Sequence, residues 1–219
     1  MSEAEAEAKE RLRRTFSPIP SPDLADAGGI PLPPGLAAVG REPRLCGFAR
    51  TVRLAPGDNL GLQALAVLAG PGDVIVAVDG GEETALVGEL LCLRAAVRGG
   101  AGFVVDGYVR DREALALPVF ARGAQPRRPA RQDFAAIDEP VELLGVPVAP
   151  GDLVLADPDG IVVVRKEDLE SVLVRLEAVQ AADGQARAAV LAGEDLGWLD
   201  AALEGRPRAQ RSRTESWEA

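Results

Sequence analysis

Short apolar segments alternate with helical segments through the middle of the chain, and this alternation constrains the fold more than any other feature. The segment at 74–78 (VIVAV) is dominated by β-branched residues, which is typical of a strand buried on both faces. Because the loops between elements are short, the pattern predicts an α/β domain. Further strands are predicted at 46–54, 103–105, 118–120, 153–155 and 161–164, and a helix at 88–98.

Turn and cap residues predict where several elements begin and end. Ser21, directly before a proline, is expected to be the N-cap of a short helix that stops at Gly28. The strand at 103–105 is expected to end at Asp106-Gly107, where glycine would let the chain turn. The segment 157–160 (DPDG) is typical of a β-hairpin turn.

The two ends of the chain differ in character from the middle. Residues 1–14 are polar and predict either a helix or a frayed N-terminal arm, residues 15–205 predict a single domain, and residues 206–219 predict a polar, disordered tail. Two C-terminal helices are expected within the domain, at 166–182 and about 184–204. Apolar residues recur at helical spacing in the first of them.

The chain contains no histidine among its 219 residues. Catalysis by Ser-His-Asp or Cys-His groups is therefore excluded, and so are histidine-ligated zinc and iron sites. The two cysteines, Cys46 and Cys92, lie among apolar residues and are expected to be buried thiols in a reducing compartment. Acid–base chemistry near neutral pH is left to carboxylates, lysine, tyrosine, cysteine or metal-bound water.

Net charge and hydropathy narrow the class of partner. A formal charge of −10 disfavours a nucleic-acid surface, since Lys and Arg dominate phosphate binding. No segment approaches the roughly 20 apolar residues of a membrane span, and residues 1–14 lack the apolar region of a signal peptide. We therefore expect a cytoplasmic protein that binds neither nucleic acid nor membrane.

Arg110 and Asp111 form the first candidate site. They follow the strand predicted at 103–105, and ligands of open α/β sheets usually bind at the carboxyl ends of strands. The Arg110 guanidinium suits a carboxylate or an enolate oxygen, and the Asp111 carboxylate suits a hard divalent cation. Taken alone, the same two residues also fit a capped turn with a surface ion pair.

The second candidate site is Gly88-Glu89-Leu90-Leu91, at the start of a predicted helix. The first backbone N–H groups of a helix have no partner within it and attract anions. Taken alone, Glu89 in the first turn is ordinary helix electrostatics. One helix, one loop and one strand separate Glu89 from Arg110, and such a βαβ-like unit can bring both to one pocket. That pocket would suit a small keto acid chelated by Mg²⁺.

The spacing Glu89-x20-Arg110-Asp111 resembles the D/E-x20-R-D signature of the RraA-like family, in particular its class II, divalent-metal-dependent pyruvate aldolases. These aldolases act on 4-hydroxy-4-methyl-2-oxoglutarate or 4-carboxy-4-hydroxy-2-oxoadipate. The resemblance covers about residues 15–205. Further segments similar to the family's motifs are 23–27 (DLADA), 47–52 (GFARTV), 56–59 (PGDN), 71–74 (PGDV), 118–123 (PVFARG), 150–152 (PGD) and 157–164 (DPDGIVVV).

The resemblance implies a fold, an assembly and a set of residue roles. The fold is a swivelling β/β/α domain with C-terminal helices, assembled as homotrimers or hexamers with pockets between subunits. Gly88, Glu89, Leu90 and Leu91 would contact substrate, chiefly through backbone amides. Arg110 would bind the keto or enolate oxygen. Asp111 would ligate Mg²⁺ or Mn²⁺ directly, and Glu89 would hold metal-bound water.

The implied activity is retro-aldol cleavage of 4-hydroxy-4-methyl-2-oxoglutarate, or a related 4-hydroxy-2-oxo acid, to pyruvate. Oxaloacetate decarboxylation, which passes through the same enolate, is the expected second activity. In the aldolases a C-terminal glutamate of a neighbouring subunit also acts through water, and Asp183 is the candidate to replace it here.

Two alternatives to this activity stay open. One is a non-catalytic, RraA-type regulator that binds ribonuclease E. The other is an enzyme of a specialised pathway that uses the same enolate chemistry on another substrate. The regulators typically lack the aspartate of the Arg-Asp pair, so Asp111 favours an enzyme.

Overall fold

The computed structural model describes residues 3–78, 81–133 and 136–194. The chain divides into two compact units, Met1–Glu177 and Ala178–Ala219. The sheet and the candidate site lie in the first unit. No helix of the described part of the chain is long and apolar enough to cross a membrane. The predicted tail at 206–219 lies outside the described residues.

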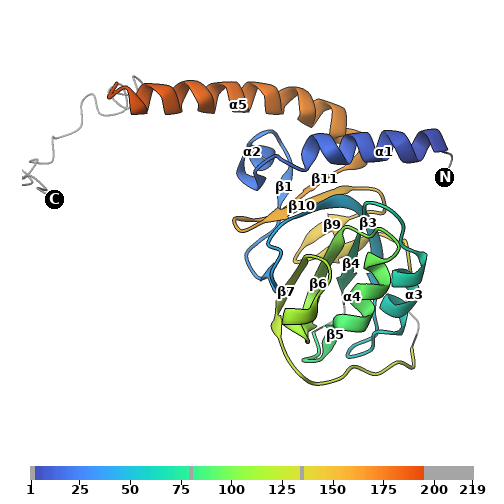
Figure 1. Cartoon of the computed structure of the whole chain (residues 1–219). Helices are drawn as coiled ribbons and strands as arrows, with labels where there is room; N and C mark the ends of the chain where they lie inside the picture. The colour runs from blue at the N-terminus through green and yellow to red at the C-terminus, as the bar shows by residue number, and fades with distance from the viewer. Residues whose placement is uncertain (1–2, 79–80, 134–135, 195–219) are drawn as a thin grey trace, which may run out of the picture. The chain divides into compact units, whose positions relative to one another are not determined.

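A mixed sheet forms the centre of the first unit (Figure 1). Its strand order over the described residues is β1-β11-β10-β3-β4-β6-β7-β2, with β5 pairing with β6. The pairs β3–β4, β4–β6, β5–β6 and β6–β7 are parallel, and the outer pairs are antiparallel. The strands are β1 Ile30–Pro31, β2 Ala37–Ala38, β3 Leu45–Arg53, β4 Asp73–Val78, β5 Ala85–Val87, β6 Gly102–Val109, β7 Val119–Ala124, β10 Leu153–Asp157 and β11 Gly160–Val164.

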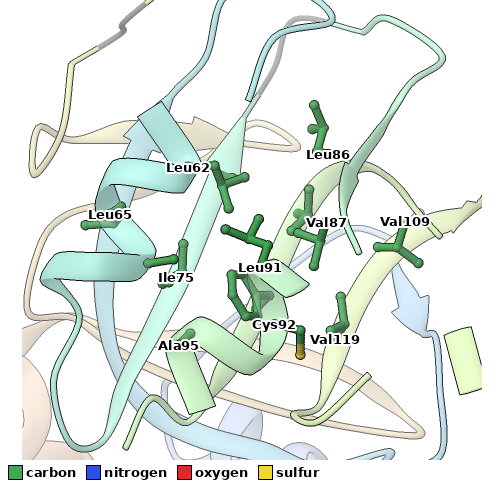
Figure 2. Packing of buried hydrophobic residues seen from close by; sticks show 14 of the residues in the cluster. Leu62, Leu65, Ile75, Leu86, Val87, Leu91, Cys92, Ala95, Val109 and Val119 are labelled. Carbon is green, nitrogen blue, oxygen red and sulfur yellow. The ribbon is translucent and has the colours of Figure 1, made fainter. Parts of the chain in front are cut away.

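Helices α3 and α4 lie on one face of the sheet, over β4 and β6 (Figure 1). Figure 2 shows Leu65 of α3, and Leu91 and Cys92 of α4, packed in one cluster with Ile75 of β4. Burial of these apolar faces is the main stabilising term for such short helices. The helices are α1 Glu3–Phe16, α2 Ser21–Asp26, α3 Leu60–Leu68, α4 Glu89–Ala96 and α5 Leu169–Leu191, with 3₁₀ turns at Arg112–Ala114 and Lys166–Asp168.

The opposite face of the sheet packs against the hairpin of β8 (Val141–Leu143) and β9 (Val146–Val148). Val76 of β4 shares a buried cluster with residues of this hairpin, whereas Ile75 belongs to the cluster beneath α3 and α4. Successive side chains of a strand point to opposite faces. The apolar run at 74–78 is therefore buried on both faces, as predicted, and the predicted α/β class is confirmed.

Strand β6 continues to Val109 rather than ending at Asp106-Gly107, the end that its glycine predicts. Gly107 lies inside the strand because Leu86 of β5 occupies the place of its missing side chain. A Cβ at position 107 would lie 2.6 Å from Leu86 Cδ1. The β6–β7 register also shifts at this point. In the sequence alone, a glycine that makes space for a neighbouring strand cannot be distinguished from a glycine in a turn.

Two helix predictions are wrong in detail. Ser21 is the first residue of α2, and its N-cap is Pro20. The single helix α5 replaces the two helices expected at 166–182 and about 184–204, although residues beyond 194 lie outside the described part. A Cβ at Gly184 meets nothing within 4 Å. One exposed glycine destabilises a helix by only about 1 kcal/mol, so α5 continues through it.

Ser21 is buried against the carboxylate of Asp157, at the end of β10. Its hydroxyl and backbone N–H donate to Asp157 at 2.6 and 2.8 Å, and the Asp159 N–H donates at 3.0 Å. Burial by itself raises the pKa of the Asp157 carboxyl, but these hydrogen bonds and nearby Arg44 outweigh burial and leave its pKa lowered. The ionised carboxylate therefore joins α2 to the β10–β11 hairpin.

Replacing Ser21 with alanine is expected to lower the free energy of unfolding by about 1.5–3 kcal/mol at pH 7, the usual contribution of a hydrogen bond to a charged group. The pKa of Asp157 is lower in the folded than in the unfolded state. Its stabilisation is therefore complete above the unfolded pKa and disappears as the pH falls through the folded pKa. Urea unfolding from pH 7 down to about pH 3 measures both effects.

The matched control is Ser171→Ala, which removes an exposed hydroxyl that donates to the Asp168 carbonyl. This change is expected to shift the unfolding free energy by less than about 0.5 kcal/mol. Equal stability of Ser21→Ala and the wild-type protein at pH 7 would show that the Ser21–Asp157 bond contributes nothing.

Candidate active site

The pairing of β5 with β6 brings the two candidate segments together. Among the described residues, the pairing of β4 with β6 runs to Val78 and Asp106, and β5 pairs with the end of β6 beyond that point. Val87 is the register partner of Val109, and the Arg110 N–H donates to the Val87 carbonyl at 2.9 Å. The residue after Val87 therefore lies next to Arg110.

The N-terminus of α4 faces Asp111. Gly88 is the N-cap of this helix, and the Glu89 N–H donates to Asp111 Oδ2 at 3.3 Å. Leu91 is buried in the cluster of Figure 2 and anchors the first turn, whereas the Leu90 side chain is 74% exposed. An anchored helix N-terminus offers backbone N–H groups and a positive dipole end to an anion.

Asp111 has a backbone conformation that few residues other than glycine adopt. Its φ of 58° lies in the left-handed region, and it is the N-cap of the 3₁₀ turn Arg112–Ala114. Non-glycine residues in this region carry strain and occur preferentially at functional sites. The turn leaves Asp111 Oδ2 at 3.6 Å from the Nε of Arg110.

Gly88 is required by space rather than by its backbone conformation. Its φ of −144° is extended backbone that any residue adopts. A Cβ at this position would, however, lie 2.9 Å from Asp111 Oδ2 and 3.1 Å from Arg110 Cγ. The absence of a side chain at residue 88 therefore lets the carboxylate and the guanidinium approach the start of α4.

Glu89, Arg110 and Asp111 border an open cleft of about 700 Å³. The residues that line it include Glu89, Asp111 and Glu113, which carry carboxylates, and Arg110 and Arg112, which carry guanidinium groups. Residues 124–126, at the end of β7 and just beyond it, line the rest. Three anionic and two cationic side chains give the lining a formal charge of −1, which a bound cation would compensate.

The donor atoms at the cleft suit a hard divalent cation. They are carboxylate oxygens, and Mg²⁺ is commonly held by one or two carboxylates together with waters and substrate. Within the part of the chain that the structure describes, no three His, Cys, Asp or Glu side chains form a metal-binding cluster.

The cleft brings together Glu89, Arg110 and Asp111, with Gly88 packed behind them. Asp183 is exposed and belongs to the second unit, so its role stays a prediction. Arg112 and Glu113 also line the cleft, and sequence reasoning missed them. Their position directly after the Arg-Asp pair is the signal that could have identified them.

Comparison with known proteins identifies the family. The RraA-like family model, described as Aldolase/RraA, matches residues 21–163. The chain therefore belongs to the RraA-like family, and the predicted fold of that type is confirmed.

Relatives of this chain carry two kinds of name. A Halalkalibacterium halodurans protein named "Putative 4-hydroxy-4-methyl-2-oxoglutarate aldolase" is 37% identical over 174 residues, covering 77% of this chain and 83% of that protein. A Thermus thermophilus protein named 4-hydroxy-4-methyl-2-oxoglutarate aldolase is 38% identical over 146 residues, covering 64% of this chain and 88% of that protein. The solved structure of Streptomyces coelicolor RraAS2, described as an unusual member of the RNase ES inhibitor RraA family, has a TM-score of 0.71 at 30% identity. The match covers 81% of this chain and 97% of the RraAS2 chain.

Proposed function

We propose that the protein is a divalent-metal-dependent carbon–carbon lyase. Its substrate would be 4-hydroxy-4-methyl-2-oxoglutarate or a related 4-hydroxy-2-oxo acid, and its product pyruvate. The observation that carries the proposal is the meeting of Glu89, Arg110 and Asp111 at one cleft, beside the N-terminus of α4. The relatives named as aldolases support it.

The proposed cofactor is Mg²⁺ or Mn²⁺. Asp111 would hold the ion directly, and Glu89 and Asp183, the latter from a neighbouring copy, would reach it through water. The net negative charge of the cleft lining supports this assignment, because a dianionic substrate would otherwise be repelled. A bound divalent cation supplies Lewis-acid polarisation of the substrate's keto group.

Each protein group has a defined task in the proposed cleavage. Backbone N–H groups of Leu90 and Leu91 orient the substrate carboxylate at the start of α4. Glu89 receives, through water, the proton of the C4 hydroxyl, whose oxygen becomes a carbonyl as the C3–C4 bond breaks. The electron pair of that bond passes to the pyruvate enolate, and Arg110 stabilises the developing negative oxygen. Protonation of C3 then gives pyruvate, and decarboxylation of oxaloacetate would form the same enolate.

Pyruvate release, coupled to lactate dehydrogenase, tests the proposal. The purified protein is assayed with 4-hydroxy-4-methyl-2-oxoglutarate and with oxaloacetate, in Mg²⁺ or in EDTA. We expect release from both substrates, lost in EDTA and restored by Mg²⁺. Release from oxaloacetate alone would indicate a different natural substrate for the same enolate chemistry. Silence on both by the folded protein would overturn the lyase assignment and favour a regulator of ribonuclease E type.

We also propose that the protein assembles with itself, as a homotrimer or hexamer, through an apolar stripe beside the cleft. The stripe consists of Leu90 and Leu93 on α4, Val97 at its C-cap, and Val67 and Leu68 on α3, all of which are exposed. Residues spaced by three, four and seven positions lie on one face of a helix. The stripe begins directly after Glu89, so a second copy seated on it would border the cleft.

Val97→Asp is expected to reduce the mass measured by light scattering after gel filtration, because a charge buried in an apolar interface is costly. Val174→Asp is the matched control: Val97 and Val174 are 72% and 71% exposed, and Val174 lies on α5. If Val174→Asp dissociates and Val97→Asp does not, the interface lies on α5 and not on α4. An unchanged mass for Val97→Asp would contradict the proposed stripe.

A further inference from the structure

We propose that Arg112 selects dicarboxylic 2-oxo acids by binding the substrate carboxylate remote from the keto group. The inference rests on the proposed function, because it assigns a substrate class to the same cleft. It concerns affinity for that distal carboxylate and gives Arg112 no part in breaking the carbon–carbon bond.

The left-handed turn at Asp111 determines where Arg112 lies. Arg112 begins the 3₁₀ turn that follows, and it lines the same cleft as Arg110, two residues before it. Its backbone carbonyl would lie 3.4 Å from a Cβ at Gly40, so its main chain packs closely against a neighbouring segment. Arg110 and Arg112, one on either side of Asp111, thus both line the cleft.

The two guanidinium groups differ in how they are occupied. Arg110 Nε lies 3.6 Å from Asp111 Oδ2, and the Arg110 guanidinium is the group proposed to bind the keto oxygen. Over residues 3–78, 81–133 and 136–194, no carboxylate lies within ion-pair distance of Arg112. An arginine without a carboxylate partner of its own retains its paired N–H donors for a ligand carboxylate, which they match in geometry.

The size of the cleft is consistent with this role. A volume of about 700 Å³ exceeds the need of a pyruvate unit alone and leaves space for the rest of a branched acid. With a divalent cation bound, the lining would change from a formal charge of −1 to +1, which favours a dianionic substrate over a monoanionic one.

Matched substrates test the inference. Kinetics are measured for 4-hydroxy-4-methyl-2-oxoglutarate, which has a distal carboxylate, and for 4-hydroxy-4-methyl-2-oxopentanoate, which has a methyl group there. Arg112→Gln is expected to raise KM for the dicarboxylate by about tenfold to a hundredfold, the usual effect of losing a charge-assisted hydrogen bond. The kcat for the dicarboxylate and the KM for the monocarboxylate should change little. Arg112→Lys should restore part of the lost affinity.

The control variant is Arg127→Gln, which removes an exposed guanidinium close to the cleft that does not line it. It should leave both KM values unchanged. An equal rise in KM for both substrates in Arg112→Gln would indicate general electrostatic attraction and would overturn the assignment of a distal-carboxylate site. Unchanged KM values would overturn it as well.

A binding experiment separates this inference from the proposed function. Calorimetric titration in Mg²⁺ compares 2-oxoglutarate with 2-oxobutanoate, which lacks the second carboxylate. We expect the wild-type protein to prefer 2-oxoglutarate and Arg112→Gln to lose the preference. One outcome is that the wild type cleaves neither 4-hydroxy-4-methyl-2-oxoglutarate nor oxaloacetate and still shows this Arg112-dependent binding preference. In that case the lyase proposal fails and the Arg112 assignment stands. If the wild type shows no preference, the Arg112 assignment fails whatever the activity.

Discussion

Replacing Asp111 with asparagine is expected to lower kcat/KM by about 10³-fold while leaving the fold intact. In the proposed chemistry the Asp111 carboxylate holds the divalent cation, and a neutral amide cannot supply its charge. Asparagine adopts left-handed backbone as readily as aspartate, so the turn at residue 111 should form in the variant. Losing several kcal/mol of transition-state stabilisation corresponds to a loss of about 10³-fold in kcat/KM.

Pyruvate release in Mg²⁺, together with thermal unfolding, measures this effect. Asp159→Asn makes the same chemical change in the exposed turn of the β10–β11 hairpin and is expected to keep full activity. Binding of Mn²⁺, followed by its paramagnetic signal, gives a readout that does not depend on turnover, and Asp111→Asn should weaken it. Wild-type Mn²⁺ affinity in a folded Asp111→Asn protein would contradict the assignment of Asp111 as the ligand.

Replacing Gly88 with alanine is expected to cost about a hundredfold in kcat/KM, the scale reported for a misplacement of about 1 Å at an active site. The new Cβ would lie 2.9 Å from Asp111 Oδ2, too close for a real contact. The end of the Asp111 side chain can swing away without moving the backbone, so the fold should tolerate the change. The carboxylate would then leave the position that the start of α4 and Arg110 define.

Thermal unfolding distinguishes this effect from general destabilisation. The Tm of Gly88→Ala should stay within a few degrees of the wild-type value, because less than about 1 kcal/mol of stability is at stake. Gly184→Ala is the control: its Cβ meets no neighbour, and alanine should stabilise α5 without altering activity. Full activity of Gly88→Ala would show that the close approach of Asp111 to residue 88 is unnecessary.

Elements whose stability depends on local patterns were predicted from the sequence. The β-branched run at 74–78 became β4, and the Asp-Pro-Asp-Gly segment became the turn between β10 and β11, with Asp157 paired to Gly160. Strand periodicity and turn chemistry involve residues only a few positions apart, so both can be inferred without the fold.

Elements whose character depends on distant contacts were not predicted correctly. Gly107 marks a turn by composition, yet it continues β6 because Leu86 fills the space beside it. The three-residue strand β5 is too short to produce a periodic signal, and its pairing with the end of β6 defines it. The division expected between helices at 166–182 and about 184–204 fails for a local reason instead: α5 continues through Gly184 because one exposed glycine destabilises a helix only slightly.

The site divides in the same way between sequence and structure. By itself the sequence determined which groups were available: no histidine, an arginine followed by an aspartate after a buried strand, and a glutamate in the first turn of a helix. Only the tertiary structure decided which of them meet, through the parallel register of Val87 with Val109 and the left-handed turn that brings Arg112 to the cleft. Periodicity is a property of neighbouring residues, whereas register and side-chain approach depend on pairing between strands that lie far apart in the chain.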